Sequence, residues 1–265
     1  MRLFKGKLSV IMPAYNEGHH IYNNLKETHK VFKRSRCGFE VILVDDGSGD
    51  NTYFEAQKAA LDLGSTIPLN ITKNTGKGNA LKEGFARATG DYVIFLDADL
   101  DLHPAQLSHI FKIMRNEKAD VIIGSKYHPD STIDYPASRK LLSKVYAGVL
   151  NVLFDLNLHD TQTGMKVFRR EVLERVFPLV TCKGFAFDIE VLTNAHKLGY
   201  KVVEAPVILD NRREMQWGRI TIKDMYKMWI DTMAIYYRLN RKKPGKAKPE
   251  SGAVKDNKEY GAIKR

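Results

Sequence analysis

Three carboxylates alternate at the end of a short apolar run near the middle of the chain. The run Tyr92–Leu96 is rich in β-branched and aromatic residues, as is typical of a buried strand in a parallel sheet. Asp97, Asp99 and Asp101 follow it. Carboxylates this close repel one another unless a cation neutralises them, and Mg²⁺ and Mn²⁺ bind carboxylate oxygens together with substrate phosphates. We therefore expect Mg²⁺ or Mn²⁺ at this strand end, with a solvated acidic turn as the alternative for the motif taken alone.

Apolar runs and helix-like patterns alternate along the first 124 residues. This pattern predicts an α/β fold, with a mostly parallel sheet and helices on both of its faces. The expected strands of this part cover 8–12, 39–44, 67–72, 92–96 and 120–124. Asn16 is the expected N-cap of the first helix. After residue 125 we expect helices over 138–154, 184–197 and 222–239, and short strands within 160–168 and 200–209.

Other polar segments follow the neighbouring strands of this predicted sheet. Pro13, Ala14, Tyr15 and Glu17 come after the first strand, where a ring and backbone groups can cradle a nucleotide base. Asp45 ends the second strand, where a carboxylate either accepts hydrogen bonds from a base or ribose or caps the next helix. Taken alone, the two interpretations of Asp45 have equal weight.

A glycine-rich turn, 74–79, leads into the third helix and carries Lys77. It has the spacing of neither a Walker loop nor a GxGxxG fingerprint, and by itself a plain turn explains it better than a phosphate site. All four polar segments, however, follow parallel strands, whose carboxyl ends meet at one edge of a sheet. We therefore expect them to converge on one cleft, and a charged nucleotide with a bound metal explains them together.

Basic charge is concentrated at the end of the chain. The 265 residues carry a net charge of +11, and 241–265 alone has nine Lys or Arg against three Asp or Glu. This composition predicts a disordered tail that suits an anionic surface. Two distant cysteines, Cys37 and Cys182, suggest a reducing compartment. Because we find neither a membrane-spanning run nor a signal peptide, we expect a cytoplasmic protein.

Four motifs resemble those of the inverting glycosyltransferases of family 2: VIMPAYNE at 10–17, VDDGSGDNT at 44–52, NTGKGNA at 74–80 and FLDAD at 95–99. Two later segments, DTQTGMKVF at 160–168 and FAFDIEVL at 185–192, look like the polyprenyl-phosphate branch, which contains dolichyl-phosphate mannose synthases and glucosyltransferases. The resemblance implies a GT-A fold, a UDP-glucose or GDP-mannose donor, a polyprenyl- or dolichyl-phosphate acceptor, a divalent metal and inversion.

The resemblance also implies a role for individual positions. The donor would be bound by Pro13, Ala14, Tyr15, Glu17, Asp45, Lys77, Asp97 and Arg213, with Arg212 as the alternative to Arg213. The catalytic residues would be Asp97 and Asp160, and the metal would be held by Asp99 and Asp101. The acceptor phosphate would meet Lys126, Arg139 and Ser143. Lys126 stands where mannose synthases usually carry arginine, and a lysine binds phosphate as a point charge rather than as a fork.

The expected organisation is a catalytic domain over 1–210, with a nucleotide-sugar half (1–124) and an acceptor half (125–210), then an amphipathic helix within 211–240 and the tail. The apolar stripe of that helix is Ile222, Met225, Tyr226, Trp229, Met233 and Tyr236, and its opposite face Lys223, Asp224, Lys227, Asp231 and Arg238. We expect the stripe to lie at the cytoplasmic face of a membrane, with ordinary core or a homodimer contact as alternatives. The expected partners are a nucleotide sugar, a polyprenyl-phosphate lipid and the membrane surface, and not nucleic acid.

Three other functions compete with this interpretation. A nucleotide-sugar-forming nucleotidyltransferase would need a glycine-rich signature near the N-terminus, which we do not find. A basic nucleic-acid-binding protein leaves the strand-end carboxylates unexplained, because they would repel phosphates without a cation. A family 2 enzyme acting on a sugar hydroxyl would need a general base, and Asp160 or Asp188 would be that base.

Overall fold

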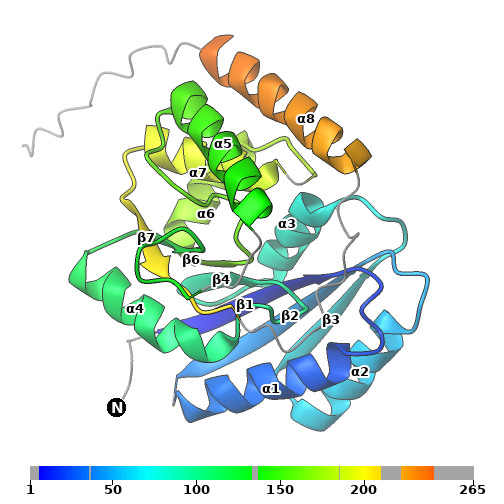
Figure 1. Ribbon diagram of the computed structural model, residues 1–265. Coiled ribbons are helices and arrows are strands. Elements are labelled where there is room, and N and C mark those ends of the chain that lie inside the picture. Colours follow the sequence, from blue (N-terminus) through cyan, green and yellow to red (C-terminus); the bar gives the residue numbers. More distant parts are fainter. Residues whose placement is uncertain (1–5, 36, 133–136, 185, 210–221, 242–265) are drawn as a thin grey trace, which may run out of the picture.

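A seven-stranded sheet forms the centre of the computed structural model, in the order β3-β2-β1-β4-β6-β5-β7 (Figure 1). The structure describes residues 6–35, 37–132, 137–184, 186–209 and 222–241. The strands are β1 (Lys7–Ala14), β2 (Gly38–Asp46), β3 (Thr66–Ile71), β4 (Tyr92–Leu96), β5 (Val121–Ser125), β6 (Met165–Arg169) and β7 (Val202–Pro206). The helices are α1 (Ile21–Arg34), α2 (Thr52–Leu63), α3 (Lys77–Arg87), α4 (Leu107–Asn116), α5 (Ala137–Phe154), α6 (Arg170–Val176), α7 (Phe187–Lys197) and α8 (Ile222–Arg241), with short 3₁₀ turns at Pro104–Gln106 and Phe177–Leu179.

The sheet is mostly parallel, which confirms the predicted fold class. Only the pairings of β6 are antiparallel, to β4 on one side and β5 on the other. β1 lies between β2 and β4, so the chain builds outward to β3 and then crosses back to β4. Such a reversal of strand order opens a crevice at the carboxyl ends of the strands. The register sets Ala14 beside Asp45 and Ile11 beside Phe95, so the segments after β1, β2 and β4 meet at that edge.

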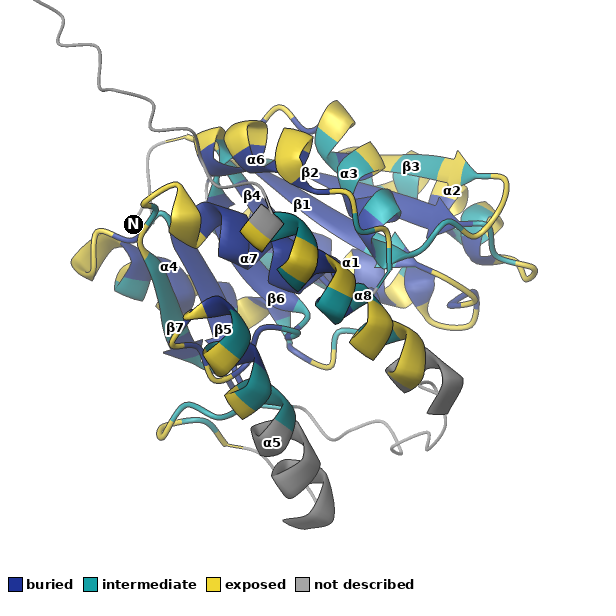
Figure 2. Cartoon of the chain, turned by 90° about the horizontal axis from the view of Figure 1, so that it is seen from above, coloured by how far each residue is buried: buried dark blue, intermediate teal, exposed yellow. Residues whose placement is uncertain are grey.

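Both faces of the sheet are buried under helices. Helices α1, α2 and α4 cover one face, where Val10 and Met12 of β1 lie in the core. Helices α3, α6 and α7 cover the other face, where Ile11 is buried. Successive residues of a strand point to opposite faces, so a strand covered on both sides is apolar at nearly every position. Figure 2 shows the buried central strands beneath helices whose outer faces are exposed.

The expected helix cap at Asn16 is wrong. Helix α1 begins at Ile21, and its N-cap, His20, makes no side-chain cap hydrogen bond. Asn16 adopts a left-handed backbone conformation (φ 55°), and its side-chain oxygen accepts a hydrogen bond from the N–H of Gly49 (2.9 Å). The N–H of Asn16 in turn donates to Oγ of Ser48 (2.9 Å). Asn16 therefore ties together the two loops that follow β1 and β2 rather than starting a helix.

Helix α8 packs against the domain, and the predicted division of its faces is wrong in part. Thr232 and Ile235 are buried, and Arg238 reaches inward to donate to Oε1 of Glu190 (2.6 Å), a fully buried carboxylate on α7. A buried carboxylate needs a cation, so this ion pair helps to set the rotation of the helix. Arg238 was expected on the opposite, polar face, whereas Tyr226 and Trp229 of the predicted apolar stripe are exposed. Among residues 226–240 of α8, the exposed large hydrophobic residues are Tyr226, Trp229, Ile230 and Tyr237.

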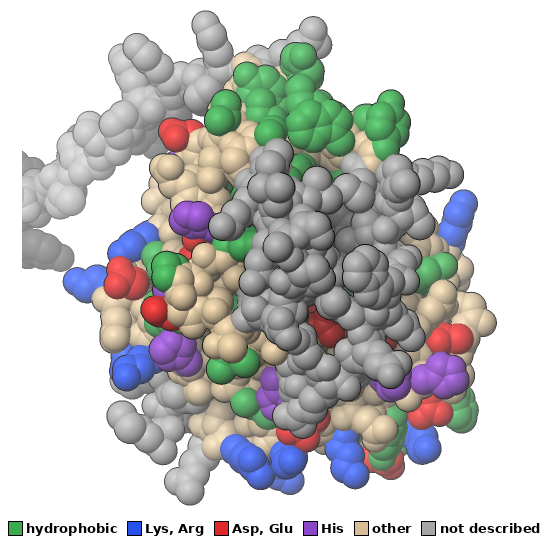
Figure 3. Space-filling view, in the orientation of Figure 1, with side chains coloured by type: hydrophobic (Ala, Val, Ile, Leu, Met, Phe, Trp, Pro, Cys, Tyr) green, Lys and Arg blue, Asp and Glu red, His purple; other side chains and the backbone are tan. Residues whose placement is uncertain are grey.

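Hydrophobic side chains gather at the top of the molecule in Figure 3, the end at which α8 lies in Figure 1. Within the described segments, no helix is both long enough and apolar enough to cross a membrane.

Candidate active site

The three alternating carboxylates follow β4 on a tight turn. The carbonyl of Asp97 accepts the N–H of Leu100 (3.2 Å), and Leu100 adopts a left-handed conformation (φ 55°) to close the turn. Oδ1 of Asp99 accepts the N–H of Asp101 (3.2 Å). Asn24, buried on α1, donates its side-chain amide to the carbonyl of Ala98 (2.6 Å). The turn is therefore fixed to a helix as well as to the sheet.

Gly164 closes the other side of this turn. Its carbonyl accepts the N–H of Asp97 (3.2 Å), just before β6 begins. A Cβ atom on Gly164 would overlap Oδ2 of Asp97. The site therefore requires glycine at this position, because any side chain would displace the first of the three carboxylates.

Two lysine–aspartate ion pairs form around Asp97. Nζ of Lys77, the first residue of α3, lies 2.6 Å from Oδ1 of Asp97. Nζ of Lys166, on β6, lies 2.9 Å from Oδ1 of Asp188 on α7, and it also donates to the carbonyl of Thr163. The side chains of Lys166 and Asp188 are only 2% and 6% exposed, so this second pair is part of the protein interior.

These groups set one another's ionisation. Burial opposes the charge of Asp97, but Lys77 and Lys166 outweigh it and hold the pKa of Asp97 below its ordinary value. Burial also opposes the charge of Lys77, yet Asp97 and Asp188 outweigh it and raise the pKa of Lys77. At Lys166 burial dominates, and its pKa is lowered despite the attraction of Asp188. Asp97 and Lys77 are therefore both charged at neutral pH.

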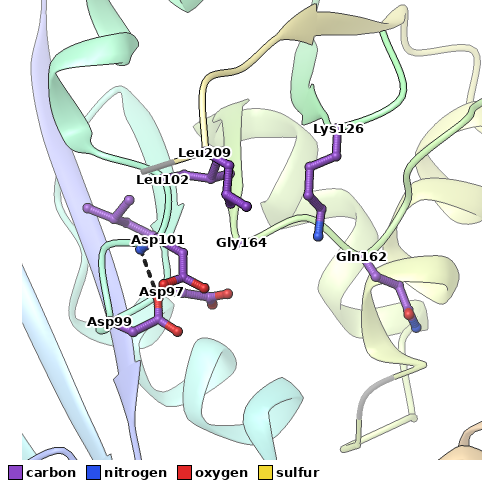
Figure 4. A pocket seen from close by; sticks show the side chains of 9 residues that line it. Asp97, Asp99, Asp101, Leu102, Lys126, Gln162, Gly164 and Leu209 are labelled. Atoms are coloured by element: carbon purple, nitrogen blue, oxygen red, sulfur yellow. Dashed lines mark hydrogen bonds between the residues drawn. The ribbon is translucent and has the colours of Figure 1, made fainter. Parts of the chain in front are cut away.

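A pocket of about 80 Å³ opens over the turn, lined by Leu96, Asp97, Asp99, Asp101, Leu102, Lys126, Gln162, Gly164 and Leu209. Figure 4 shows the three carboxylates together on one side, with Lys126 reaching in from the other. In the part of the chain that is described, no three His, Cys, Asp or Glu side chains form a metal cluster of their own. The turn nevertheless fits Mg²⁺ or Mn²⁺, since such ions use one or two carboxylates and complete their shell with phosphate and water.

The predicted base-binding residues lie at the same edge of the sheet but outside the lining of this pocket. Pro13 and Ala14 are the last residues of β1, and Tyr15, just beyond them, is half exposed. The backbone N–H of Glu17 donates to Oγ1 of Thr52 (2.8 Å), at the start of α2. These contacts fix the loop after β1 against the loop after β2 and leave the Tyr15 ring at the surface.

Asp45 and its neighbour Asp46 accept hydrogen bonds from different loops. Asp45 is buried and accepts hydrogen bonds from the N–H (3.1 Å) and the hydroxyl of Ser48. Asp46 accepts from the N–H and Oγ1 of Thr75 (both 2.8 Å) and from the N–H of Gly76 (2.8 Å). Asp46 thus holds the glycine-rich turn in the position from which Lys77 reaches Asp97.

Asp160, predicted to be catalytic, and Lys126, predicted to meet the acceptor phosphate, lie together. Oδ2 of Asp160 accepts the backbone N–H of Lys126 (3.0 Å), and the Lys126 side chain lines the pocket. Arg139 and Ser143 lie on α5, at positions whose side chains are outside the described residues. Arg212 and Arg213 also fall outside the described residues. The roles of these four residues therefore remain predictions.

Sequence reasoning missed the residues that hold the site together. Asn24, Asp46 and Lys166 act from α1, β2 and β6, and only the packing of these elements brings them to the turn. Lys166 gives no signal in the sequence, because it reaches the site through the antiparallel pairing of β6 with β4, opposite Phe95. Gly164 lies in the segment 160–168, where its requirement for glycine becomes visible only beside Asp97.

Comparison with known proteins places this geometry in a family. The model described as "Glycosyl transferase family 2" matches residues 9–177. The dolichyl-phosphate beta-glucosyltransferase ALG5D of Trichomonas vaginalis is 30% identical over 251 residues, which cover 88% of this chain and 74% of that protein. The dolichyl-phosphate beta-glucosyltransferase of Dictyostelium discoideum is 32% identical over 218 residues, covering 76% of this chain and 65% of that protein. Glycosyltransferase AglD of Haloferax volcanii is 31% identical over 203 residues, which are 76% of this chain but only about a third (32%) of AglD.

Solved structures share the fold at lower identity. Glucosyl-3-phosphoglycerate synthase of Mycobacterium tuberculosis, in complex with Mn²⁺, UDP-glucose and phosphoglyceric acid, superposes with a TM-score of 0.66 at 18% identity, covering 88% of this chain and 79% of that one. The mannosyltransferase PcManGT of Pyrobaculum calidifontis, in complex with GDP-Man and Mn²⁺, gives a TM-score of 0.59 at 19% identity, covering 90% and 65%.

Proposed function

Because the chain belongs to glycosyl transferase family 2 and is a glycosyltransferase, we propose that it transfers a hexose from a nucleotide sugar to a polyprenyl phosphate, with inversion at the anomeric carbon and with Mg²⁺ or Mn²⁺. The relatives named dolichyl-phosphate beta-glucosyltransferase support this acceptor class. The family match also favours an enzyme over the nucleic-acid-binding alternative.

The observation that carries the proposal is the opposition of charges within one pocket. Asp97, Asp99 and Asp101 line one side, and Lys126 lines the other (Figure 4). The acidic side suits a cation that carries a sugar diphosphate, and the basic side suits an anionic acceptor. A reaction between a metal-bound diphosphate sugar and a lipid phosphate needs these two ends at a short separation.

At the donor end, the chain's own residues bind and orient the nucleotide sugar. Tyr15 and Asp45 receive the base and ribose, and Lys77, positively charged beside Asp97, is placed to bind the diphosphate. Asp99 and Asp101 would hold the metal ion, which would supply positive charge to neutralise the leaving nucleoside diphosphate. Asp97 stays ionised because Lys77 and Lys166 lower its pKa.

At the acceptor end, positioning replaces base catalysis. A lipid phosphate is already an anion, so the enzyme has no proton to remove from its nucleophile. Lys126 binds the phosphate and Asp160 orients Lys126 through its backbone N–H. Asp188, one of the two candidates for the general base that transfer to a sugar hydroxyl would require, is buried in an ion pair with Lys166 (2.9 Å). This pairing supports a phosphate acceptor over a hydroxyl acceptor.

Glucose is the sugar we propose first, with UDP-glucose as its donor and GDP-mannose as the alternative. Two relatives about 30% identical to the chain carry the name beta-glucosyltransferase. The fold itself is compatible with either base, because the solved neighbours include one complex with UDP-glucose and one with GDP-Man.

We further propose peripheral binding at the cytoplasmic face of a membrane, where the acceptor lipid is met. The exposed Tyr226, Trp229 and Ile230 on α8 suit the headgroup boundary, and basic residues of 241–265 add roughly 1 kcal/mol each near an anionic leaflet. Flotation with anionic vesicles tests this. The double variant Tyr226→Ser and Trp229→Ser should lower the bound fraction about tenfold. Phe54→Ser, an equally exposed aromatic residue on α2, should not.

A transfer assay tests the function itself. The protein is incubated with UDP-glucose or GDP-mannose and a short polyprenyl phosphate, with Mn²⁺ or with a chelator, and the lipid product is identified by mass spectrometry. We expect a hexosyl polyprenyl phosphate that forms only with the metal. Transfer to a sugar hydroxyl, with none to the lipid phosphate, would contradict the proposal.

A further inference from the structure

Glu204 is a carboxylate in the middle of β7, a strand at the edge of the sheet. Its side chain is 11% exposed. Oε1 accepts the backbone N–H of both His159 (2.8 Å) and Asp160 (3.0 Å), and Oε2 lies 2.6 Å from Nδ1 of His159. A carboxylate that receives two backbone N–H groups and an imidazole clamps the turn that carries them, because charge-assisted hydrogen bonds are about twice as strong as neutral ones.

The clamped turn leads directly to the acceptor side of the pocket. Asp160, held by Glu204 through its N–H, uses Oδ2 to accept the N–H of Lys126 (3.0 Å). The same turn continues to Gln162 and Gly164, which line the pocket together with Lys126. Glu204 is not among the lining residues, so any effect it has on the reaction passes through the turn.

We propose that Glu204 is a positioning residue for the acceptor phosphate, acting through Asp160 on Lys126. This inference rests on the proposed function. Without the clamp, the turn loses its anchor on β7, and Lys126 shifts relative to the carboxylates that hold the donor. A displacement of about 1 Å at such a site costs on the order of 100-fold in rate. The donor end shares the Gly164–Asp97 hydrogen bond with this turn (3.2 Å) but has further contacts from Asp46 and Asn24, so we expect it to shift less than Lys126.

The test compares Glu204→Ala and Glu204→Gln with the wild type in steady-state transfer to a short polyprenyl phosphate. Glu204→Ala should raise KM for the acceptor about tenfold or more, while KM for the nucleotide sugar changes less than about twofold. Glu204→Gln keeps an oxygen for the backbone donors and should recover most of the loss. A merely structural role would lower the melting temperature and the active fraction but would leave the acceptor KM unchanged, and that outcome would overturn the inference.

A double variant shows whether Glu204 acts through Asp160. If it does, Glu204→Ala combined with Asp160→Asn should be no worse than Asp160→Asn alone, because coupled residues are not additive. If the losses caused by Glu204→Ala and Asp160→Asn added fully in the double variant, Glu204 would not act through Asp160. Glu117→Gln is the matched control, since Glu117 forms an exposed ion pair with Lys201 (3.1 Å), the residue just before the same strand. It should behave as wild type. Wild-type protein that fails to transfer to the lipid phosphate would overturn the proposed function, and this inference with it.

Discussion

The amino ends and the carboxyl ends of the strands form two opposite edges of the sheet, and the carboxylates at these edges have different surroundings. At the amino edge, Glu40 on β2 accepts hydrogen bonds from Nζ of Lys7 (2.5 Å), Oγ of Ser9 (2.6 Å) and the N–H of Thr89 (2.7 Å). These contacts join β1, β2 and the segment between α3 and β4, so the carboxylate ties together one end of the sheet. Burial opposes its charge, but Lys7, Ser9 and Thr89 outweigh burial and lower the pKa of Glu40.

At the carboxyl edge the carboxylates crowd together instead. Asp97, Asp99 and Asp101 share one pocket, and the nearest ion pair, from Lys77, engages the first of them. Such crowding costs free energy in the protein alone and is repaid by a cation and a charged ligand. We infer that Glu40, surrounded by donors from its own sheet, stabilises the fold, whereas the carboxylates gathered after β4 serve a ligand.

The largest expected effect is at the carboxyl edge. Asp99→Asn removes a charge from the turn proposed to bind the metal without removing volume, so transfer should fall by about 100-fold or more. The melting temperature should stay within about 2 °C of wild type, because Asp99 is partly exposed. Kinetics and thermal unfolding measure the two quantities. Asp62→Asn, on the exposed side of α2, is the control and should change neither. Wild-type rates in Asp99→Asn would refute its metal role.

Gly164→Ala tests whether the position of the Asp97 carboxylate matters at the carboxyl edge, without changing any charge. The added Cβ overlaps the Asp97 carboxylate and must push it out of position, so activity should fall by about 10- to 100-fold. Gly49→Ala is the control, because a Cβ there meets nothing within 4 Å. Equal kcat/KM for wild type and Gly164→Ala would show that the position of Asp97 has no bearing on the reaction.

At the amino edge the expected effect is on stability alone. Glu40→Gln leaves Lys7 and the Thr89 N–H with weaker acceptors, so the free energy of unfolding should fall by about 1–3 kcal/mol. For a domain of this size that lowers the melting temperature by roughly 2–10 °C. The kcat/KM of the folded variant should remain within about twofold of wild type. A large loss of activity with unchanged stability would contradict the assignment of Glu40 to the stability of the fold.

The smallest effect is a dependence on pH at that same residue. Because the folded-state pKa of Glu40 is lowered, the unfolded chain binds more protons there, and its stabilisation is complete above the ordinary carboxyl pKa of about 4.3. It is lost as pH falls through the folded-state pKa. The difference in melting temperature between wild type and Glu40→Gln should therefore be constant from about pH 6 to 5 and should narrow below about pH 4. A difference that widens in acid would contradict this assignment.

The sequence predicted the carboxyl edge far better than the amino edge. Strand β4 was predicted with its observed bounds, Tyr92–Leu96, because an apolar β-branched run between Gly90 and a cluster of carboxylates leaves little choice of element. The convergence of Tyr15, Asp45 and Asp97 on one edge followed from β-α alternation alone. Glu40 gave no such signal, since an acidic residue inside a strand is recognised as a clamp only when its partners from β1 and α3 are placed.

Long-range packing also explains why the sequence did not predict several other features of the structure. The face of α8 could not be read from its apolar stripe, because the pairing of Arg238 with Glu190 on α7 helps to fix its rotation. Asn16 has the chemistry of a helix cap, but the loop after β2 offers its side chain the N–H of Gly49 instead. Lys166 and Glu204 lie on β6 and β7, strands that are added to the sheet after the first 125 residues, beyond the motifs that identify the nucleotide half.

Calorimetric titration of UDP and GDP tests most directly whether the crowded carboxylates exist to hold a metal-bound nucleotide. Wild type and Asp99→Asn are compared in Mn²⁺ and in chelator. We predict tight binding of one nucleotide to wild type only with Mn²⁺, and a loss of about tenfold or more in affinity in Asp99→Asn. Equal affinity in chelator and in Mn²⁺, unaffected by Asp99→Asn, would contradict the account.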